Sequence, residues 1–198
     1  KYIFISSGAA FGGDFESPVD EHTRAMVPIN DPTTQDWYGI AKLYAECRHR
    51  SVPQLSVVDV RVFNYFSRNQ DLSAQFLITD IIRSIKQGKH FVTSSENIVR
   101  DYLHPTDFSR IISLLLCASP RNAVFDCYSK APIDKLGLLA EFEDRFNLRY
   151  ELAPHRTSLT GIRAKKNYLS VSRTLQKVGY APSYSSLEGL CEEVSALL

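Results

Sequence analysis

The strongest constraint on the fold is a strand, a helix and a second strand near the amino terminus. The apolar run at 2–5 and the β-branched run LSVVDVRV at 55–62 have the composition of buried strands. Residues 36–50 between them have a helical pattern, with Asp36 as the expected N-cap. A strand, a helix of this length and another strand form a right-handed parallel unit. We therefore expect an α/β protein built on a parallel sheet.

Helices and strands continue to alternate along the rest of the chain, as is typical of the α/β class. Further helices are expected at 73–87, 105–117, 133–146, 172–178 and 185–197. Extended segments are expected at 91–93, 98–103, 124–128 and 149–152, with loops up to residue 35 and at 157–166. The expected apolar face of the first helix consists of Ile40, Leu43, Tyr44 and Cys47.

Length and charge exclude several classes of function. With 198 residues, of which 44% are hydrophobic, the chain can bury one core, or a core plus a small second lobe. Its 23 lysines and arginines nearly balance 22 aspartates and glutamates, so we expect no nucleic-acid partner. No apolar run reaches the ~18 residues of a membrane span, and we expect no membrane partner.

The cysteines and the first residues of the chain add two expectations. Cys47, Cys117, Cys127 and Cys191 stand far apart, without C-x-x-C spacing or paired histidines. This predicts no metal site and no disulfide framework, and reduced thiols indicate a cytoplasmic location. The chain starts with a lysine at the first expected strand, and no signal peptide precedes it. We therefore expect it to be part of a longer protein.

The opening stretch KYIFISSGAAFGG invites comparison with a phosphate-binding loop. Its glycine spacing, G-x-x-x-G-G, fits neither G-x-G-x-x-G nor G-x-x-x-x-G-K-[ST], and Pro18 argues against a helix directly after it. The two serines at the end of the strand, Ser6 and Ser7, are therefore the more informative residues.

Tyr38 and Lys42 are the second informative pair. Four positions apart on the expected helix, they lie one turn from each other on one face. An ammonium near a phenol favours the ionised phenol, which suits a general base. Alone, this spacing is weak, and a partly exposed helix pair without chemistry is the alternative.

The position of Ser7 favours a chemical role for Tyr38 and Lys42 over a helix pair without chemistry. Ser7 ends the preceding strand, and the carboxyl ends of parallel strands meet at the edge of the sheet where ligands bind. Since the helix with Tyr38 begins at the same edge, a hydroxyl, a phenol and an ammonium are expected to converge there. Such a set suits proton exchange with a substrate hydroxyl while hydride is transferred at its carbon.

Six stretches in the same order resemble the extended short-chain dehydrogenase/reductases, the NAD(P)-dependent nucleotide-sugar epimerases, dehydratases and reductases typified by UDP-galactose 4-epimerase. They are YIFISSGAAFGG, SPVDE, WYGIAKLYAE, VRVFNYFSRNQ, IVRDYLHPTDFSRII and LQKVGYAPSYSSLEGL. The resemblance implies a partial Rossmann-like parallel sheet with a smaller mixed α/β lobe. Residues 1–66 would be the carboxy-terminal part of the NAD(P)-binding domain. Residues 67–198 would mainly bind the nucleotide sugar, with 104–130 returning to the sheet.

The resemblance also implies catalytic and cofactor-binding roles. Ser7 would hydrogen-bond the reacting sugar hydroxyl and Tyr38 would be the acid/base. Lys42 would hold the nicotinamide ribose of NAD or NADP and favour the ionised form of Tyr38. Ser6 and Phe63 are further expected cofactor contacts.

Other matches fall on substrate-binding and structural positions. Asn64 and Arg100 match residues that contact the nucleotide sugar at its diphosphate, and Arg156 loosely matches a second diphosphate arginine. His104 and Asp101 fall at scaffold positions. Asp107 is also expected to be structural, capping a helix that starts at Phe108.

Departures from the family pattern concern mainly the substrate. Gly8 and Ala9 stand where the 4,6-dehydratase branch has acids, which disfavours a dehydratase, and Phe11 stands where a tyrosine is common. The glycine-rich turn that binds the dinucleotide does not occur in the sequence. We expect an epimerase or a 4-ketoreductase that is a homodimer in its full-length form. A truncated, non-catalytic module that binds nucleotide sugars or another partner is the alternative.

Overall fold

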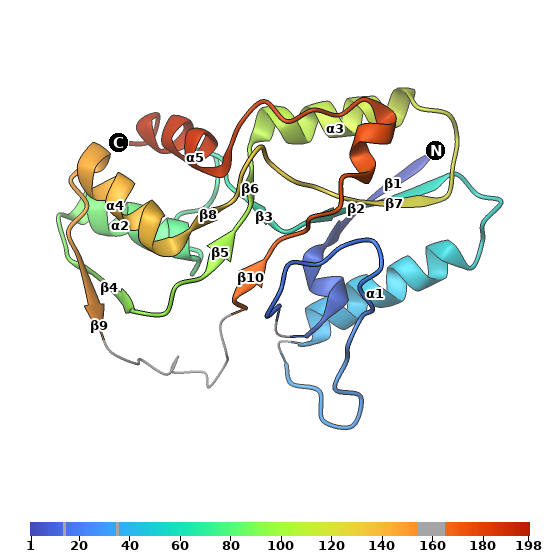
Figure 1. Cartoon of the computed structure of the whole chain (residues 1–198), viewed down its shortest axis with the longest axis horizontal. Helices are drawn as coiled ribbons and strands as arrows, with labels where there is room; N and C mark the ends of the chain where they lie inside the picture. Colours follow the sequence, from blue (N-terminus) through green and yellow to red (C-terminus); the bar gives the residue numbers. More distant parts are fainter. Residues whose placement is uncertain (14, 35, 154–164) are drawn as a thin grey trace.

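A three-stranded parallel sheet forms the centre of the fold. The computed structural model describes residues 1–13, 15–34, 36–153 and 165–198 (Figure 1). The sheet has the order β1-β2-β7, with β1 (Tyr2–Ser7), β2 (Val57–Val62) and β7 (Ala123–Asp126). In its register Ser7 lies opposite Val62. The expected α/β class with a parallel sheet is therefore confirmed.

Two helices cover opposite faces of this sheet: α1 (Asp36–Arg50) and α3 (Pro105–Cys117) (Figure 1). On the α3 side, Val58 and Val60 of β2 pack in one apolar cluster with Ile111 and Leu115. Asp59, between the two valines, points to the other face, because side chains alternate along a strand. The two helices thus pack on the two opposite faces of the same strand, β2.

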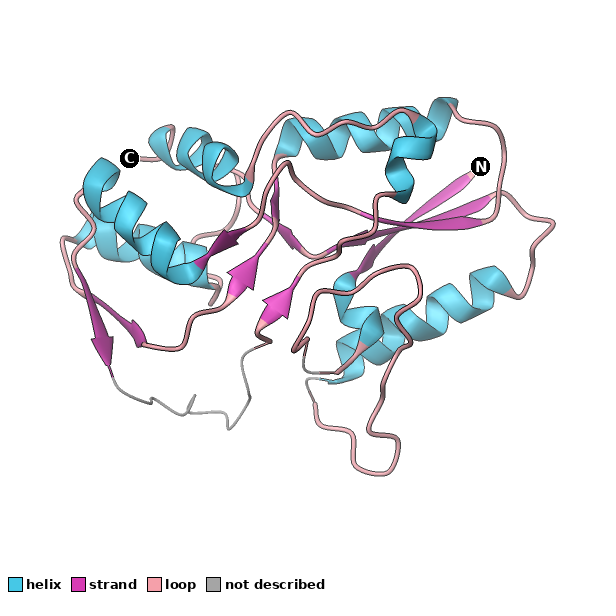
Figure 2. Cartoon of the chain, viewed as in Figure 1, coloured by secondary structure: helices cyan, strands magenta, loops and turns pink. Residues whose placement is uncertain are grey.

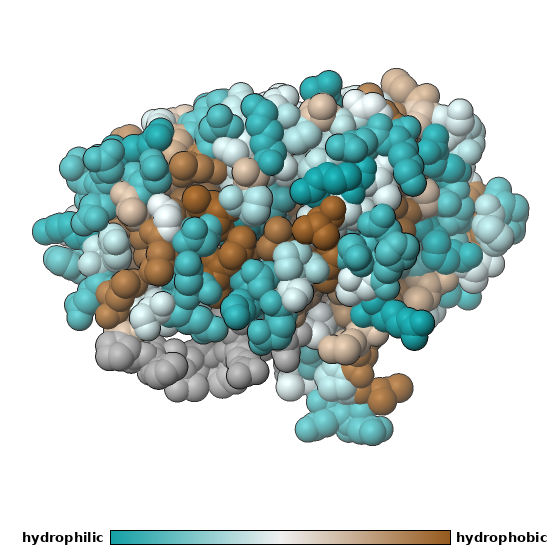
Figure 3. All heavy atoms as spheres, viewed as in Figure 1, coloured by the Kyte–Doolittle hydropathy of each residue, from teal (hydrophilic) through white to brown (hydrophobic). Residues whose placement is uncertain are grey.

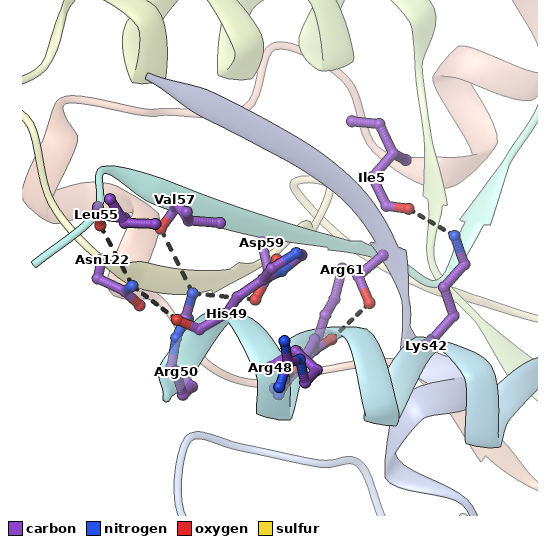
Figure 4. A network of polar contacts seen from close by, with 12 residues as sticks. Ile5, Lys42, Arg48, His49, Arg50, Leu55, Val57, Asp59, Arg61 and Asn122 are labelled. Carbon is purple, nitrogen blue, oxygen red and sulfur yellow. Dashed lines mark hydrogen bonds and ion pairs between the residues drawn. The ribbon is translucent and has the colours of Figure 1, made fainter. Parts of the chain in front are cut away.

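The face of β2 toward α1 is charged and buried. His49 Nδ1 lies 2.6 Å from Asp59 Oδ1, and Arg50 Nη2 lies 3.1 Å from Asp59 Oδ2 (Figure 4). Two positions further along β2, Arg61 pairs with Glu46 of α1 at 2.5 Å and with Asp126 of β7 at 3.3 Å. Ion pairs therefore hold α1 on the sheet where apolar contacts hold α3.

The second part of the molecule is a smaller lobe of helices and short strands (Figure 2). Its core joins α2 (Leu77–Gln87), α4 (Lys135–Phe146) and α5 (Ser186–Ser195) through Ile81, Ile82, Leu138, Leu139, Phe142, Leu190 and Val194. Its strands are β4 (Phe91–Ser94) paired with β9 (Tyr150–Ala153), and β5 (Val99–Arg100) between β10 (Asn167–Tyr168) and β8 (Ile133–Asp134). The pair β3 (Asn64–Tyr65) and β6 (Tyr102–Leu103) links β2 to this lobe, and two 3₁₀ helices, η1 (Gly8–Phe11) and η2 (Thr174–Val178), complete the described elements.

Several expected element boundaries are wrong for local reasons. The helix expected at 73–87 begins at Leu77, because Asp71 and Ser73 form a turn and Thr79 accepts a hydrogen bond from the N–H of Phe76. The helix expected from 133 begins at Lys135, since 133–134 pair with β5 and Asp134 is the N-cap. Residues 174–178 form a 3₁₀ helix rather than an α-helix.

Three expectations about residues in and beside helices are also corrected. Asp36 is the first residue of α1, and its carboxylate accepts from Thr33. Tyr44 and Cys47 are exposed and do not belong to a buried apolar face. Asp107 does not cap α3, because His104 is the N-cap; the Asp107 carboxylate instead accepts from the N–H of Ser183.

The loop between η1 and α1 projects from the body of the molecule. Val27 and Ile29 are exposed on it, and Figure 3 shows apolar side chains on the projection at the lower right. Gly12 anchors the start of the loop with a φ of 61°, and a Cβ there would lie 1.9 Å from the carbonyl oxygen of Met26. Among the described residues, no helix has the length and apolarity to cross a membrane.

Candidate active site

A cavity of about 710 Å³ opens at the carboxyl ends of β1 and β2. Its walls include all the sequence-predicted site residues that the structure describes: Ser6, Ser7, Tyr38, Lys42, Phe63, Asn64 and Arg100. Arg156 lies outside the described residues. The cavity lies between the two parts of the molecule, since residues of α2 and β5 complete its lining.

Gly39 brings the helix with Tyr38 against the turn that follows Ser7. A Cβ at Gly39 would lie 2.6 Å from the carbonyl oxygen of Ala9, so only glycine permits this approach. The Tyr38 side chain, 58% exposed, then lines the cavity on the side of Ser7. The glycine inside Y-G-I-A-K thus has a packing role.

Lys42 is fixed by β1 and lies close to Tyr38. Its ammonium donates to the carbonyl oxygen of Ile5 at 2.7 Å (Figure 4). It also lies 4.7 Å from the ring centroid of Phe4 and 5.5 Å from that of Tyr38. One of its hydrogens is used by the strand, and an ammonium has two others to donate.

Ser7 and Ser6 point to different surroundings. The Ser7 hydroxyl oxygen accepts from the N–H of Ala9 at 3.2 Å and lies 3.1 Å from the phenol oxygen of Tyr168. The Ser6 hydroxyl donates to Glu46 at 2.5 Å and is buried. The side chain of Ser6 is therefore used to hold α1 on β1, and its hydroxyl hydrogen does not point into the cavity.

Phe63 and Asn64 form the floor on the side of β2. The ring of Phe63 lies against Gly8, where a Cβ would come within 2.3 Å of the ring. The amide nitrogen of Asn64 lies 3.3 Å from the carbonyl oxygen of Asp101 and 3.4 Å from that of Tyr168, and donates to both. The amide is therefore oriented by backbone on two sides.

Arg100 is a half-buried cation in the cavity lining. Burial lowers the pKa of Arg100, and no described carboxylate lies within ion-pair distance of its guanidinium. The guanidinium donates to the carbonyl oxygen of Val99 at 2.7 Å and lies 5.9 Å from the ring of Tyr168. The Lys165 ammonium lies 4.8 Å from the same ring, and burial also lowers its pKa. Arg100 in the cavity lining, with Lys165 near the same tyrosine ring, favours an anionic ligand.

Tyr168 is the contact that the sequence did not indicate. It joins Ser7 across 161 positions of sequence and packs on Phe15 and Phe63, with ring centroids 4.8 and 5.3 Å away. It lies on a strand of two residues directly after the expected 157–166 loop, and no spacing motif includes it. Gln70, Gln75 and Phe76, which line the cavity, likewise carry no motif.

One group of possible metal ligands occurs among the described residues, away from the cavity lining: His104, Glu192 and Glu193. Arg68 already binds Glu193, with Nη2 2.7 Å from Oε1 and the backbone N–H 2.6 Å from Oε2. His104 Nδ1 accepts from the N–H of Thr106, which leaves the hydrogen of a neutral ring on Nε2. These hydrogen bonds indicate that His104 and Glu193 stabilise the fold rather than bind a metal ion.

Parallel strands that end at a cavity lined by serine, tyrosine, lysine and arginine define an α/β protein with its ligand site at the carboxyl edge of the sheet. The model of the NAD dependent epimerase/dehydratase family matches residues 1–127. The chain belongs to this family. No curated protein matches the sequence.

Solved structures of the same fold include epimerases and a dehydratase. UDP-N-acetylglucosamine 4-epimerase from Methanobrevibacter ruminantium is 22% identical with a TM-score of 0.77, over 98% of this chain and 61% of that one. UDP-glucose 4-epimerase from Thermotoga maritima is 20% identical with a TM-score of 0.77, over 98% and 62%. dTDP-glucose 4,6-dehydratase from Bacillus anthracis is 18% identical with a TM-score of 0.76, over 98% and 60%. The chain thus spans about three fifths of their length.

Proposed function

We propose that this chain carries the substrate-binding and proton-transfer residues of an NAD(P)-dependent nucleotide-sugar epimerase or 4-ketoreductase. The observation that carries the proposal is the single cavity that Ser7, Tyr38, Lys42 and Arg100 line together. The family and the solved relatives support the class of reaction, and the dehydratase from Bacillus anthracis was solved with NAD. UDP-glucose, bound in the Thermotoga maritima enzyme, and UDP-N-acetylmuramic acid, bound in the Methanobrevibacter ruminantium enzyme, suggest the class of substrate.

The residues present fit one end of the cofactor. The Lys42 ammonium and the Tyr38 phenol can hydrogen-bond ribose hydroxyls, and Phe63 offers an apolar surface at the cavity wall. The stretch KYIFISSGAAFGG does not have the spacing of a pyrophosphate-binding turn. We therefore assign the nicotinamide ribose end of NAD or NADP to Tyr38, Lys42, Phe63 and the backbone beside Ser6. When bound, the cofactor accepts or supplies hydride.

In this mechanism the chain's own residues hold the sugar and move its proton. Arg100 binds the diphosphate of the nucleotide sugar, and Arg156 is assigned the same task. Asn64 contacts the nucleotide sugar beside it through Oδ1, which can accept from a hydroxyl, because both amide hydrogens are donated to backbone. Ser7 holds the reacting oxygen of the sugar, and Tyr38 takes the proton from the 4-hydroxyl or returns it. An epimerase oxidises and then reduces that carbon on its two faces, whereas a reductase performs only the reduction. Gly8 and Ala9, in place of acids, favour these reactions over dehydration.

Replacement of Tyr38 by phenylalanine tests the proposal. We expect turnover of UDP-glucose or UDP-glucuronic acid by the protein isolated from its own cells to fall by about a hundredfold or more, because the proton-transfer group is lost. The dissociation constant of UDP should stay within about twofold, since the Arg100 wall is unchanged. Tyr150→Phe, a change on β9 outside the cavity, serves as the control. Undiminished turnover in Tyr38→Phe would refute the assignment.

A non-catalytic nucleotide-sugar-binding module is the second candidate. It is favoured by Arg100 in the cavity lining, which can bind an anionic ligand whether or not hydride is transferred there. Such a module binds UDP but neither NAD nor NADP. Calorimetry with UDP, NAD(H) and NADP(H) therefore separates the two candidates.

We also propose a division into lobes, an assembly and a location. The division assigns 1–66 to the cofactor side and 67–198 mainly to the substrate side, with 104–130 on the central sheet. A homodimer through α1 is supported by Trp37 and Tyr44, exposed at 58% and 65% and two turns apart on one face of α1. The four free cysteines support a reducing, cytoplasmic location.

A further inference from the structure

We propose that Tyr168 is a positioning residue that makes Ser7 a hydrogen-bond donor only, so that Ser7 cannot take the substrate's proton. The proposal rests on the proposed function of this cavity and adds to it a residue outside the family's sequence motifs. It concerns the reacting oxygen of the substrate, which would receive a hydrogen bond from Ser7 in both its hydroxyl and its ketone form.

The contacts of Ser7 carry the first step. A serine oxygen has two lone pairs and one hydrogen. The N–H of Ala9 already occupies one lone pair at 3.2 Å, and the Tyr168 oxygen lies at 3.1 Å, within reach of the second. If Tyr168 donates, both lone pairs are occupied and the Ser7 hydrogen is directed to the cavity that Ser7 lines.

The surroundings of Tyr168 favour this direction of the hydrogen bond. A phenol is a stronger donor and a weaker acceptor than an alkyl hydroxyl, and among the described residues no other side chain accepts from Tyr168. Its ring is held by Phe15 and Phe63. Burial raises the pKa of Tyr168, so the phenol keeps its hydrogen at neutral pH.

A donor-only Ser7 leaves Tyr38 as the proton acceptor of the pair. The substrate hydroxyl accepts from Ser7 and must donate its own hydrogen elsewhere, and Tyr38 lines the same cavity. In the ketone form, Ser7 donates to the carbonyl oxygen and stabilises the negative charge that develops during hydride addition. Loss of the Tyr168 hydroxyl would free a lone pair of Ser7, which could then accept the substrate hydrogen unproductively.

An NMR measurement tests the hydrogen bond without any substrate. In protein labelled with ¹³C at tyrosine Cζ, dissolved in mixed H₂O and D₂O, a slowly exchanging phenol hydrogen splits the Cζ resonance. We expect the Tyr168 resonance, assigned by its loss in Tyr168→Phe, to be split in the wild type and single in Ser7→Ala. A single line in the wild type, or a splitting that survives in Ser7→Ala, would overturn the proposal.

A double-mutant cycle tests the catalytic consequence. Tyr168→Phe should lower kcat about fivefold, the effect of one hydrogen bond, with KM for the nucleotide sugar unchanged. In the Ser7→Ala background the same change should have less than about a 1.5-fold effect, because the hydroxyl it acts on is gone. An equal loss in both backgrounds shows that Tyr168 acts on something other than Ser7 and overturns the proposal. Failure of the proposed function is visible separately, as turnover that survives Tyr38→Phe.

Discussion

Arg100 is a cation without a negatively charged partner among the residues that the structure describes. Its guanidinium is half-buried on the cavity wall and, among the described residues, bonds only to the backbone of Val99. Removing a guanidinium from water without a carboxylate partner is unfavourable. Arg100 therefore occupies this position at a cost in folding free energy. A planar donor fork matches the oxygens of a diphosphate.

Replacing Arg100 by alanine is expected to weaken binding of UDP about tenfold to a hundredfold, since a hydrogen bond to a charged group contributes about 1.5–3 kcal/mol. Calorimetry of UDP binding measures the change. Arg145→Ala is the matched control, because Arg145 is an exposed arginine that pairs with Glu141 on α4. An unchanged dissociation constant in Arg100→Ala would remove this residue from the binding site.

Single residues with a spacing motif were predictable from the sequence, whereas contacts made by folding were not. Tyr38 and Lys42 could be placed by helical periodicity, and Ser7 by its position at a strand end. Tyr168 could not, because its only link to Ser7 is spatial and its strand has two residues. The Ser6 hydroxyl is a similar case, since its bond to Glu46 depends on how α1 docks on β1.

At the scale of elements, the docking of α1 decides where Tyr38 and Lys42, the proposed reacting groups, lie. Gly39 touches the carbonyl oxygen of Ala9, and Lys42 binds the carbonyl oxygen of Ile5, so α1 is located by the backbone of β1 and its turn. The ion pairs of Glu46 and of His49 with the sheet fix the rest of the helix. Few apolar contacts are needed, and Glu46 is the only buried residue of α1.

A Gly39→Ala change is expected to push the start of α1 away from Ala9 and to lower kcat about tenfold to a hundredfold, because small displacements of reacting groups are costly. Binding of UDP should remain within about twofold, since its proposed site lies on the Arg100 wall. Steady-state kinetics and calorimetry measure the two quantities. Ala41→Gly, at an exposed position on the same helix, controls for a change in helix propensity of about 1 kcal/mol. Wild-type turnover in Gly39→Ala would show that this contact does not position Tyr38.

Element types were more predictable than their ends. The strand, helix and strand at 2–62 were expected from periodicity, because the long elements carry repeated signals. The strands at 133–134 and 167–168 were not, because a two-residue strand has no period and forms only where β5 offers a partner. The start of α2 depended on a turn held by side-chain hydrogen bonds rather than on the apolar pattern.

At the scale of the whole molecule, α1 and α3 present different outer surfaces. Trp37 and Tyr44 make the outer face of α1 aromatic, whereas α3 exposes Leu116. Tyr44→Glu should convert the proposed dimer to a monomer, because it places a charge at the centre of the proposed contact. Sedimentation velocity measures the change, and Leu116→Glu, on the opposite side of the sheet, should leave the assembly unaltered. A wild-type protein that sediments as a monomer at micromolar concentration, or a dimeric Tyr44→Glu, would contradict the proposal.

The way in which the loop before α1 is held has a consequence for how this protein can diversify. The loop starts at Gly12, which meets the backbone of Met26, and α1 is located independently by Gly39 and Lys42. Insertions or substitutions near Val27 and Ile29 therefore need not displace Ser7, Tyr38 or Lys42. Proteins that evolve from this one can therefore acquire new surfaces on the projecting loop while Ser7, Tyr38 and Lys42 keep their relative positions.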